Sequence, residues 1–412
     1  MKFISILSFF LLVIVSCQKQ DNSNSNCSWK HNQQQIITLD EAKAEISQKI
    51  QMVQNYLISE KKEGLLLTQV RNVNWITAGL MNTQIVLNKD VGAASLLIMK
   101  DGRKYVVCSG SEAGRMMEEG LRSLGYELMQ YSWYEANSEK DVRGDLIKSV
   151  SKGGTVVSDI SFPETELVSN TFKRLRYALL DSEIKRYRWL GIQSTEAVVE
   201  ICKSIKPGMN EYEMEAMTAN ALRSRGILPT VLLIAVDERI SKYRHALPGG
   251  ATLKNYAMIN IVAEKWGMPI AVTRFVHFGP LPKDLENKYN HVAKVMTQYA
   301  LATVPGKLCA EIFELCKTWY ANEGFPNEWQ LHHQGGAIGY DDREYVIYPG
   351  TKEVVQDKQA FAWNPTITGS KIEDTFIAYK DHFEVITKTE GWPMISVELN
   401  GKKYEQPGVL IR

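Results

Sequence analysis

Apolar residues in the first third of the chain follow a helical spacing once and then break into short runs. Between residues 42 and 61 they recur at helical spacing, and Thr38 followed by Glu41 gives the capping-box pattern that begins a helix. Apolar or β-branched runs, which favour strands, follow at 64–70, 72–79, 83–88, 93–100 and 104–110. Two helical stretches then alternate with two further strands, at 111–125, 126–133, 138–153 and 155–161. This order predicts a mixed α/β unit.

The second half of the chain contains an internal repeat. Residues 201–226 and 299–324 share one plan, a helix, a Pro-Gly turn, an amphipathic helix and a closing glycine, with the glycine 19 residues after the proline in both copies. The closing glycines suit a left-handed helix C-cap. A β-rich segment follows each copy, at 257–275 and at 360–379. The repeat therefore predicts a second domain of two similar halves.

The N-terminal residues have the pattern of a targeting segment. Lys2 provides a positive charge, and the apolar run from 3 to 15 is too short for a membrane-spanning helix, so a secretory signal is predicted. The run ends in Ile-Val-Ser-Cys, which resembles a bacterial lipobox. The resemblance implies removal of residues 1–16 and lipidation of Cys17. An ordinary signal peptide with a chance cysteine is the alternative.

Residues 17–36 are polar, low in complexity and almost free of apolar side chains. Such a segment cannot bury enough surface to fold, so we expect a tether between the lipid and the folded part. Gln18 is not an aspartate that would retain a lipoprotein in the inner membrane. The expected location is therefore the bacterial cell envelope, with the lipid anchor in the outer membrane.

Length, charge and cysteines limit the remaining possibilities. The folded part is expected to form two domains, residues 37–180 and 181–412, the second beginning with a helix near Asp181. The net charge is +1 and no basic cluster stands out, so nucleic acid is not an expected partner. The six cysteines include no CxxC pair, so no zinc or disulfide framework is predicted. Four of them fall in expected helices or strands and are interpreted as buried thiols: Cys108, Cys202, Cys309 and Cys316.

Five short segments of the second domain carry the most informative pattern. They are MINIVAEKWG at 258–267, IAVTRF at 270–275, HHQGGAIGY at 332–340, FAWNP at 361–365 and KIEDT at 371–375. With RNVNWITAG at 71–79 and the internal repeat, they resemble the creatinase, prolidase and aminopeptidase P superfamily, peptidase family M24. The resemblance covers essentially the whole mature chain. It implies an α+β protein with a creatinase-type N-terminal α/β domain and a C-terminal pita-bread domain, whose halves share one active-site cleft.

The segments depart from this superfamily at its metal ligands. Its peptidases hold two divalent metals through five carboxylate and histidine side chains. At the matching positions this chain has Asn260 and Ala271 for two aspartates, Gly336 for a histidine and Asn364 for a glutamate, and keeps only Glu373. Amides, a methyl group and a glycine cannot hold two dications. The sequence therefore predicts no metal and no cofactor at this site.

Creatinase offers a precedent for a metal-free site. It resembles this chain in having asparagine and alanine at the first two positions, and it hydrolyses a C–N bond through a cleft histidine. That histidine matches His245, so the resemblance implies His245 as the proton shuttle and Glu373 as a charged partner. The expected substrate-binding residues are His332, Arg343, Glu344, Asn260 and Asn364. An alternative joins His245, His332 or His333, and Glu373 into one rebuilt metal site that would suit zinc.

Three functions remain open. The first is a metal-independent, creatinase-type hydrolase that cleaves a C–N bond in a small amide, a guanidino compound or a short peptide. The second is a catalytically inactive protein that binds a ligand in the cleft, as the pita-bread domains of histone-chaperone subunits suggest. The third is an Xaa-Pro-type metallopeptidase, against which the ligand losses argue. The expected partners are a small molecule or short peptide, a membrane through the lipid and a second copy of the chain.

Overall fold

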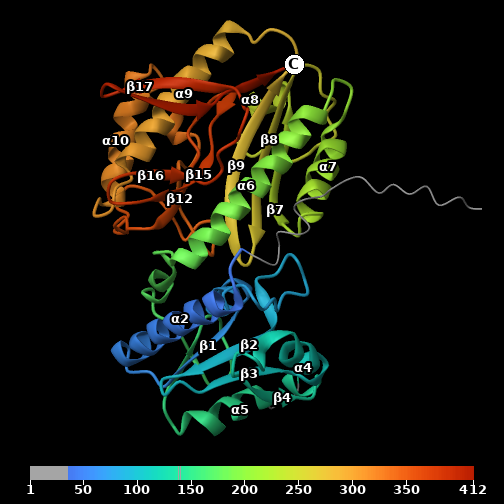
Figure 1. Cartoon of the computed structure of the whole chain (residues 1–412), viewed down its shortest axis with the longest axis vertical. Helices are drawn as coiled ribbons and strands as arrows, with labels where there is room; N and C mark the ends of the chain where they lie inside the picture. The colour runs from blue at the N-terminus through green and yellow to red at the C-terminus, as the bar shows by residue number, and fades with distance from the viewer. Residues whose placement is uncertain (1–35, 138, 140) are drawn as a thin grey trace, which may run out of the picture.

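The computed structural model describes residues 36–412 except residues 138 and 140 (Figure 1). The predicted signal peptide, Cys17 and nearly all of the tether lie outside the described residues. Within the described part of the chain, no helix combines the length and the apolar character needed to cross a membrane.

The N-terminal part is built on a six-stranded mixed sheet with the order β4-β3-β2-β1-β5-β6 (Figure 1). The strands are β1 Gly64–Gln69, β2 Val91–Met99, β3 Lys104–Ser109, β4 Glu127–Tyr131, β5 Val156–Ser158 and β6 Glu166–Leu167. The helices are α2 Leu39–Ser59, α3 Val70–Ile76, α4 Gly110–Met116 with a π-helical continuation Met117–Leu121, and α5 Val142–Ser151. Short 3₁₀ turns lie at Glu135–Asn137 and Phe172–Arg176. The mixed α/β unit expected from the sequence is confirmed.

The capping box is also confirmed, because the Thr38 hydroxyl accepts from the Glu41 amide and the Glu41 carboxylate accepts from the Thr38 amide. Two expected strands are wrong. Residues 70–76 form α3, in which Val70, Val73, Trp75 and Ile76 are all buried. Because this helix has no exposed polar face, its apolar residues do not show the spacing of an amphipathic helix. Residues 83–88 form a loop, and its apolar side chains are exposed rather than paired in the sheet.

The C-terminal part contains the two halves expected from the repeat. Four helices cover two sheets: α6 Asp181–Ser204, α7 Glu211–Arg223, α9 Lys283–Ala302 and α10 Cys309–Asn322. One sheet has the order β19-β9-β8-β7, with β7 Leu228–Val236, β8 Tyr256–Lys265, β9 Met268–His277 and β19 Val409–Ile411. The other has the order β11-β10-β12-β15-β16, with β10 Gly335–Ile338, β11 Tyr345–Val346, β12 Gln359–Trp363, β15 Asp374–Ala378 and β16 Phe383–Val385. In Figure 1, α6 and α7 lie along the first sheet, and α9 and α10 lie on the opposite side of the domain.

Small elements complete this part: α8 Glu238–Lys242, a 3₁₀ turn at Glu328–Gln330, and the hairpins β13 Thr366–Ile367 with β14 Ser370–Lys371 and β17 Met394–Leu399 with β18 Lys402–Pro407. The closing glycines of the repeat, Gly226 and Gly324, have φ of 67° and 87°, as a left-handed C-cap requires. The four cysteines outside the N-terminal segment are free and buried, as expected.

The two sheets of the C-terminal part meet between β9 and the start of β15. The Thr273 amide donates to the Glu373 carbonyl at 3.1 Å, and the Ala271 amide donates to the Thr375 hydroxyl at 2.9 Å. This junction brings the centre of β9 beside Glu373. The candidate site lies at this junction.

Candidate functional site

The centre of the site is the carboxylate of Glu373, which is only 2% exposed. Asn260 and Thr273 face each other as partners on β8 and β9, and both point at this carboxylate. The Asn260 amide nitrogen and the Thr273 hydroxyl donate to Glu373 Oε2 at 2.5 and 2.8 Å, and Asn260 also donates to the Thr273 hydroxyl at 2.5 Å. Since a carboxylate only accepts, the asparagine presents its N–H groups to the centre of the site and not its oxygen.

Two cations complete the surroundings of this carboxylate. Lys371 Nζ lies 3.0 Å from Glu373 Oε2, and Arg343 Nη2 lies 3.4 Å from Glu373 Oε1. Burial alone would raise the pKa of Glu373, but the charges of Lys371 and Arg343 outweigh it, so the pKa is lowered and the group is ionised. With two cations and one anion, this group carries an excess of positive charge. Arg343 Nε is buried without a hydrogen-bond partner among the described residues.

Three histidines converge beside this charged group. His245 follows α8, and His332 and His333 follow the 3₁₀ turn at Glu328–Gln330. The Nε2 atoms of His245 and His332 are 2.9 Å apart, so one donates a hydrogen bond to the other. Their ring centroids are 4.7 Å apart, and that of His333 lies 5.9 Å from His245 and 4.4 Å from His332. His332 is buried, whereas His245 and His333 keep part of their surface exposed to solvent.

All three imidazoles are uncharged at neutral pH. Burial, with help from the charge on Lys371, lowers the pKa of His332 to about 2. Burial and the charge on Arg343 lower the pKa of His333 to about 4. The pKa of His245 is lowered as well, by burial first and then by Lys371, with Glu373 acting in the opposite direction. An uncharged imidazole has one ring nitrogen with a lone pair, which can accept a proton.

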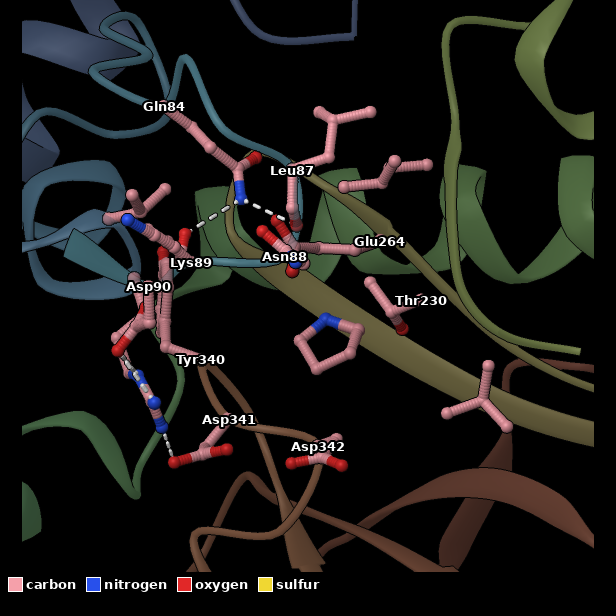
Figure 2. A pocket seen from close by; sticks show the side chains of 15 residues that line it. Gln84, Leu87, Asn88, Lys89, Asp90, Thr230, Glu264, Tyr340, Asp341 and Asp342 are labelled. Carbon is pink, nitrogen blue, oxygen red and sulfur yellow. Dashed lines mark hydrogen bonds and ion pairs between the residues drawn. The ribbon is translucent and has the colours of Figure 1, made fainter. Parts of the chain in front are cut away.

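A hollow lies between the 84–90 loop of the N-terminal part and strands β7, β8 and β9 of the C-terminal part (Figure 2). It has a volume of about 270 Å³. Four carboxylates are among the residues that line it: Asp90, Glu264, Asp341 and Asp342. Arg71 pairs with Asp90 at 2.7 Å and also with Asp341. Burial, reinforced by Asp90, raises the pKa of Glu264 to about 6. Arg343 directly follows Asp341 and Asp342, so one loop contributes side chains both to this hollow and to the surroundings of Glu373.

Comparison with known proteins identifies the architecture around this site. Residues 185–380, which include Asn260, Glu373 and all three histidines, match the sequence model of metallopeptidase family M24. This part of the chain belongs to family M24. An uncharacterized peptidase of Staphylococcus aureus strain MW2 is 23% identical over 313 residues, which cover 72% of this chain and 88% of that protein.

Two solved structures share the M24 fold with this chain. The Xaa-Pro dipeptidase from Bacillus anthracis superposes with a TM-score of 0.68 at 18% identity, covering 89% of this chain and 100% of that one. The N-terminal domain of FACT complex subunit SPT16 from chickpea, Cicer arietinum, superposes with a TM-score of 0.62 at 12% identity, covering 84% and 96%. The two-domain α+β architecture expected from the sequence is therefore present.

The side chains at the positions expected from the sequence to match the M24 metal ligands do not fit two metals. Ala271 is fully buried and offers no ligand atom. Glu373 already accepts from Asn260, Thr273, Lys371 and Arg343, so its lone pairs are committed to donors. Two cationic side chains at this carboxylate would also repel a pair of dications.

Gly336 and Asn364, at two further positions expected to match M24 ligands, lie where the local structure does not provide a metal ligand. A Cβ atom on Gly336 would lie 2.1 Å from the Tyr345 carbonyl oxygen, so a histidine there would require the β10–β11 pair to move apart. Asn364 follows β12 and is 2% exposed, and its amide oxygen has no hydrogen-bond partner among the described residues. Its backbone amide donates to the Gln334 carbonyl at 3.0 Å, which ties it to the segment that carries His332 and His333.

The residues expected to form the site do not all meet. His245, His332, Asn260, Glu373 and Arg343 are connected by contacts or by the charges they exert on one another. The Glu344 carboxylate instead pairs with Arg176 at 2.5 Å and accepts from the Tyr340 amide at 3.0 Å. No contact joins it to the histidines within the described residues, so a role for Glu344 in binding substrate stays a prediction without support from its position.

Sequence reasoning missed Lys371, although a signal for it was available. Lys371 lies two residues before Glu373, and alternate residues of an extended strand point to the same side. Its ammonium is 3.0 Å from Glu373, and its side chain is 7% exposed. Thr273, on the strand that contacts Glu373, is a second donor to this carboxylate that was not among the expected site residues.

Proposed function

We propose that this M24 protein is a hydrolase that cleaves a C–N bond in a small amide, a guanidino compound or a short peptide without a dinuclear metal centre. The observation that supports this most is the surroundings of Glu373, where Asn260, Thr273, Lys371 and Arg343 all donate to the one family ligand that is kept. A site of this kind holds a network of donors and charges where the family's peptidases hold metals.

In the proposed reaction His245 moves the proton. Its lowered pKa leaves the ring in the form that accepts a proton from water at neutral pH. The protonated ring can then deliver that proton to the leaving nitrogen. His332, at 2.9 Å, holds the ring in place through the bond between the two Nε2 atoms and acts as a positioning residue.

Lys371 and Arg343 would supply the electrostatic part of catalysis. Attack of water on an amide carbon places negative charge on the carbonyl oxygen, and cationic donors stabilise that charge. Attack on a guanidino carbon leaves the electron pair on nitrogen, and for such a substrate the same donors would instead bind a carboxylate of the molecule. Glu373 keeps these two cations in position and limits their mutual repulsion. Asn260 and Asn364 would contact the polar part of the substrate.

Turnover by the purified full-length protein in excess chelator tests this proposal. The substrates are Xaa-Pro dipeptides, N-acyl amino acids and guanidino acids such as creatine. We expect chelator-resistant hydrolysis of one class, reduced about 10²–10⁴-fold in His245→Ala, because that variant lacks the proton shuttle. His382→Ala, an exposed histidine bonded to its neighbour Asp381, is the matched control and should retain the wild-type rate. Turnover that chelator abolishes in the wild type would reject metal independence.

The second candidate function is a binding protein that keeps the cleft without chemistry. The SPT16 domain supports it, because the M24 fold occurs there in a subunit of a complex. A complete lack of turnover on every substrate class, equal in wild type and His245→Ala, would favour this candidate. We further propose, from the sequence alone, a lipid-anchored homodimer in the bacterial envelope, which cell fractionation with a Cys17→Ala variant would test.

A further inference from the structure

The three histidines beside the charged group form a cluster that the proposed reaction does not need in full. That reaction uses His245, and His332 positions it, but His333 has no part in it. One ring nitrogen from each of the three lies within 4.8 Å of the others. Among the described residues, these three histidines form the group of histidine, cysteine or carboxylate side chains that lies close enough together to share one ion.

The spacing suits a single small cation. Three imidazole nitrogens bound to zinc at 2.0–2.1 Å in a tetrahedral arrangement lie roughly 3.3 Å from one another. The Nε2 atoms of His245 and His332 already lie 2.9 Å apart, so small ring rotations would place a metal between them. His333 is exposed and adjoins His332 in the chain, so its ring is free to turn toward the same point.

The three rings converge on one point, and solvent reaches the central ring poorly. His332 is 9% exposed. Its Nδ1 atom is buried without a hydrogen-bond partner among the described residues, but Nδ1 and Nε2 point to different sides of an imidazole, so that atom does not face an ion held at Nε2. From the convergence of the three rings we infer that His245, His332 and His333 bind one divalent transition-metal cation of the Zn²⁺ class.

The ligand set also predicts selectivity. Imidazole suits zinc, copper and nickel, whereas magnesium, calcium and manganese prefer oxygen ligands. The nearest carboxylate, Glu373, is committed to four donors and offers little to a hard cation. Lys371 and Arg343 repel any cation at the histidines, so this site binds zinc more weakly than an isolated three-histidine site would. This site is separate from the family's metal positions, of which only Glu373 remains.

Metal binding has a consequence that rests on the proposed function. A cation bound at Nε2 of His245 leaves the proton of the neutral ring on Nδ1, so the ring has no lone pair left with which to accept a proton. Zinc should therefore inhibit the hydrolase, and chelator should restore it. Binding and turnover are measured separately, so the two proposals can fail independently.

Calorimetric titration of the chelator-treated full-length protein with Zn²⁺, and with Mg²⁺ for comparison, tests the site. We expect one zinc per chain and no comparable heat from magnesium. His333→Gln should weaken zinc binding at least about tenfold while leaving chelator-resistant turnover unchanged. His382→Gln, the matched control, should bind zinc as the wild type does.

The results distinguish failure of the metal site from failure of the proposed hydrolase. If zinc does not bind, or binds equally well to His333→Gln, the metal site is rejected and the proposed hydrolase is untouched. If zinc binds as expected and turnover rises with it, the site stands and the metal-free mechanism is rejected. If zinc binds and turnover falls in the wild type but not in His333→Gln, both proposals are supported.

Discussion

At the scale of single residues, the buried histidine makes stability depend on pH. His332 has a pKa of about 2 in the folded chain, against about 6.5 when unfolded. The unfolded chain therefore takes up a proton below pH 6.5 that the folded chain refuses. The contribution of the uncharged His332 ring to the free energy of unfolding is fully present above pH 6.5. It is lost as the pH falls, by about 2 kcal/mol between pH 6.5 and pH 5.

We therefore expect His332→Asn to flatten this acid dependence. The measurement is urea unfolding of both proteins at several pH values from 5 to 7.5. The slope of the free energy of unfolding below pH 6.5 should be smaller in the variant by up to about 1.4 kcal/mol per pH unit. His382→Asn should keep the wild-type slope, since that ring is exposed. Equal slopes in wild type and His332→Asn would show that another group carries the dependence.

The sequence could predict which residues lie in the site better than what each one contacts. His245, Asn260 and Glu373 were found because short segments around them match a family pattern. The pairing of Glu344 with Arg176 was beyond reach, because 168 positions separate the two residues and only the folded chain joins them. The convergence of His333 with His245 was predicted only as one alternative, the rebuilt metal site, because spacing alone does not decide whether His332 or His333 lies beside His245.

At the scale of elements, β10 explains why the lost histidine ligand cannot simply be restored. Gly336 pairs with Val346 on β11 and with Ala362 on β12, so its strand is held on both sides. A Cβ atom there would lie 2.1 Å from the Tyr345 carbonyl oxygen, a backbone atom that cannot rotate away. Both Gly336→Ala and Gly336→His should therefore lower the free energy of unfolding, by about 1–3 kcal/mol.

Chemical denaturation compares these variants with Gly114→Ala. Gly114 lies in α4 with nothing within 4 Å of an added Cβ atom, so this change should be neutral or stabilising by roughly 0.5–1 kcal/mol. Wild-type stability in Gly336→His would mean that β11 moves freely and that the strand pair does not exclude a ligand.

Elements were predictable where their hydrophobic period was clear. The repeat gave α7 and α10, because each has a polar face and a turn at both ends. The helical period of α3, residues 70–76, is hidden because all of its apolar side chains are buried. The run at 83–88 resembles a strand because an apolar loop can have the same composition as a strand. The local sequence does not show which backbone segments will pair as strands in a sheet.

At the scale of the whole molecule, a buried ionic network joins the two parts of the chain. Lys49 on α2 lies 2.7 Å from Glu45 and 2.6 Å from Glu183 on α6, and its ammonium also donates to the Tyr340 hydroxyl at 3.1 Å. Arg186 on α6 pairs with Glu45 at 2.7 Å. Tyr340 begins the loop that carries Arg343, so the network fixes the loop of the site as well as the two helices.

We expect Lys49→Met to lower the free energy of unfolding by about 3–5 kcal/mol, because it leaves two buried carboxylates short of a partner. Lys185→Met is a matched control, since Lys185 on α6 pairs with Glu41 on α2 across the same two helices, but with both side chains exposed. That change should cost at most about 1 kcal/mol. Urea unfolding measures both variants at pH 7.5. Equal costs would mean that burial adds nothing to this network, and the orientation of the two domains would then rest on their apolar contacts.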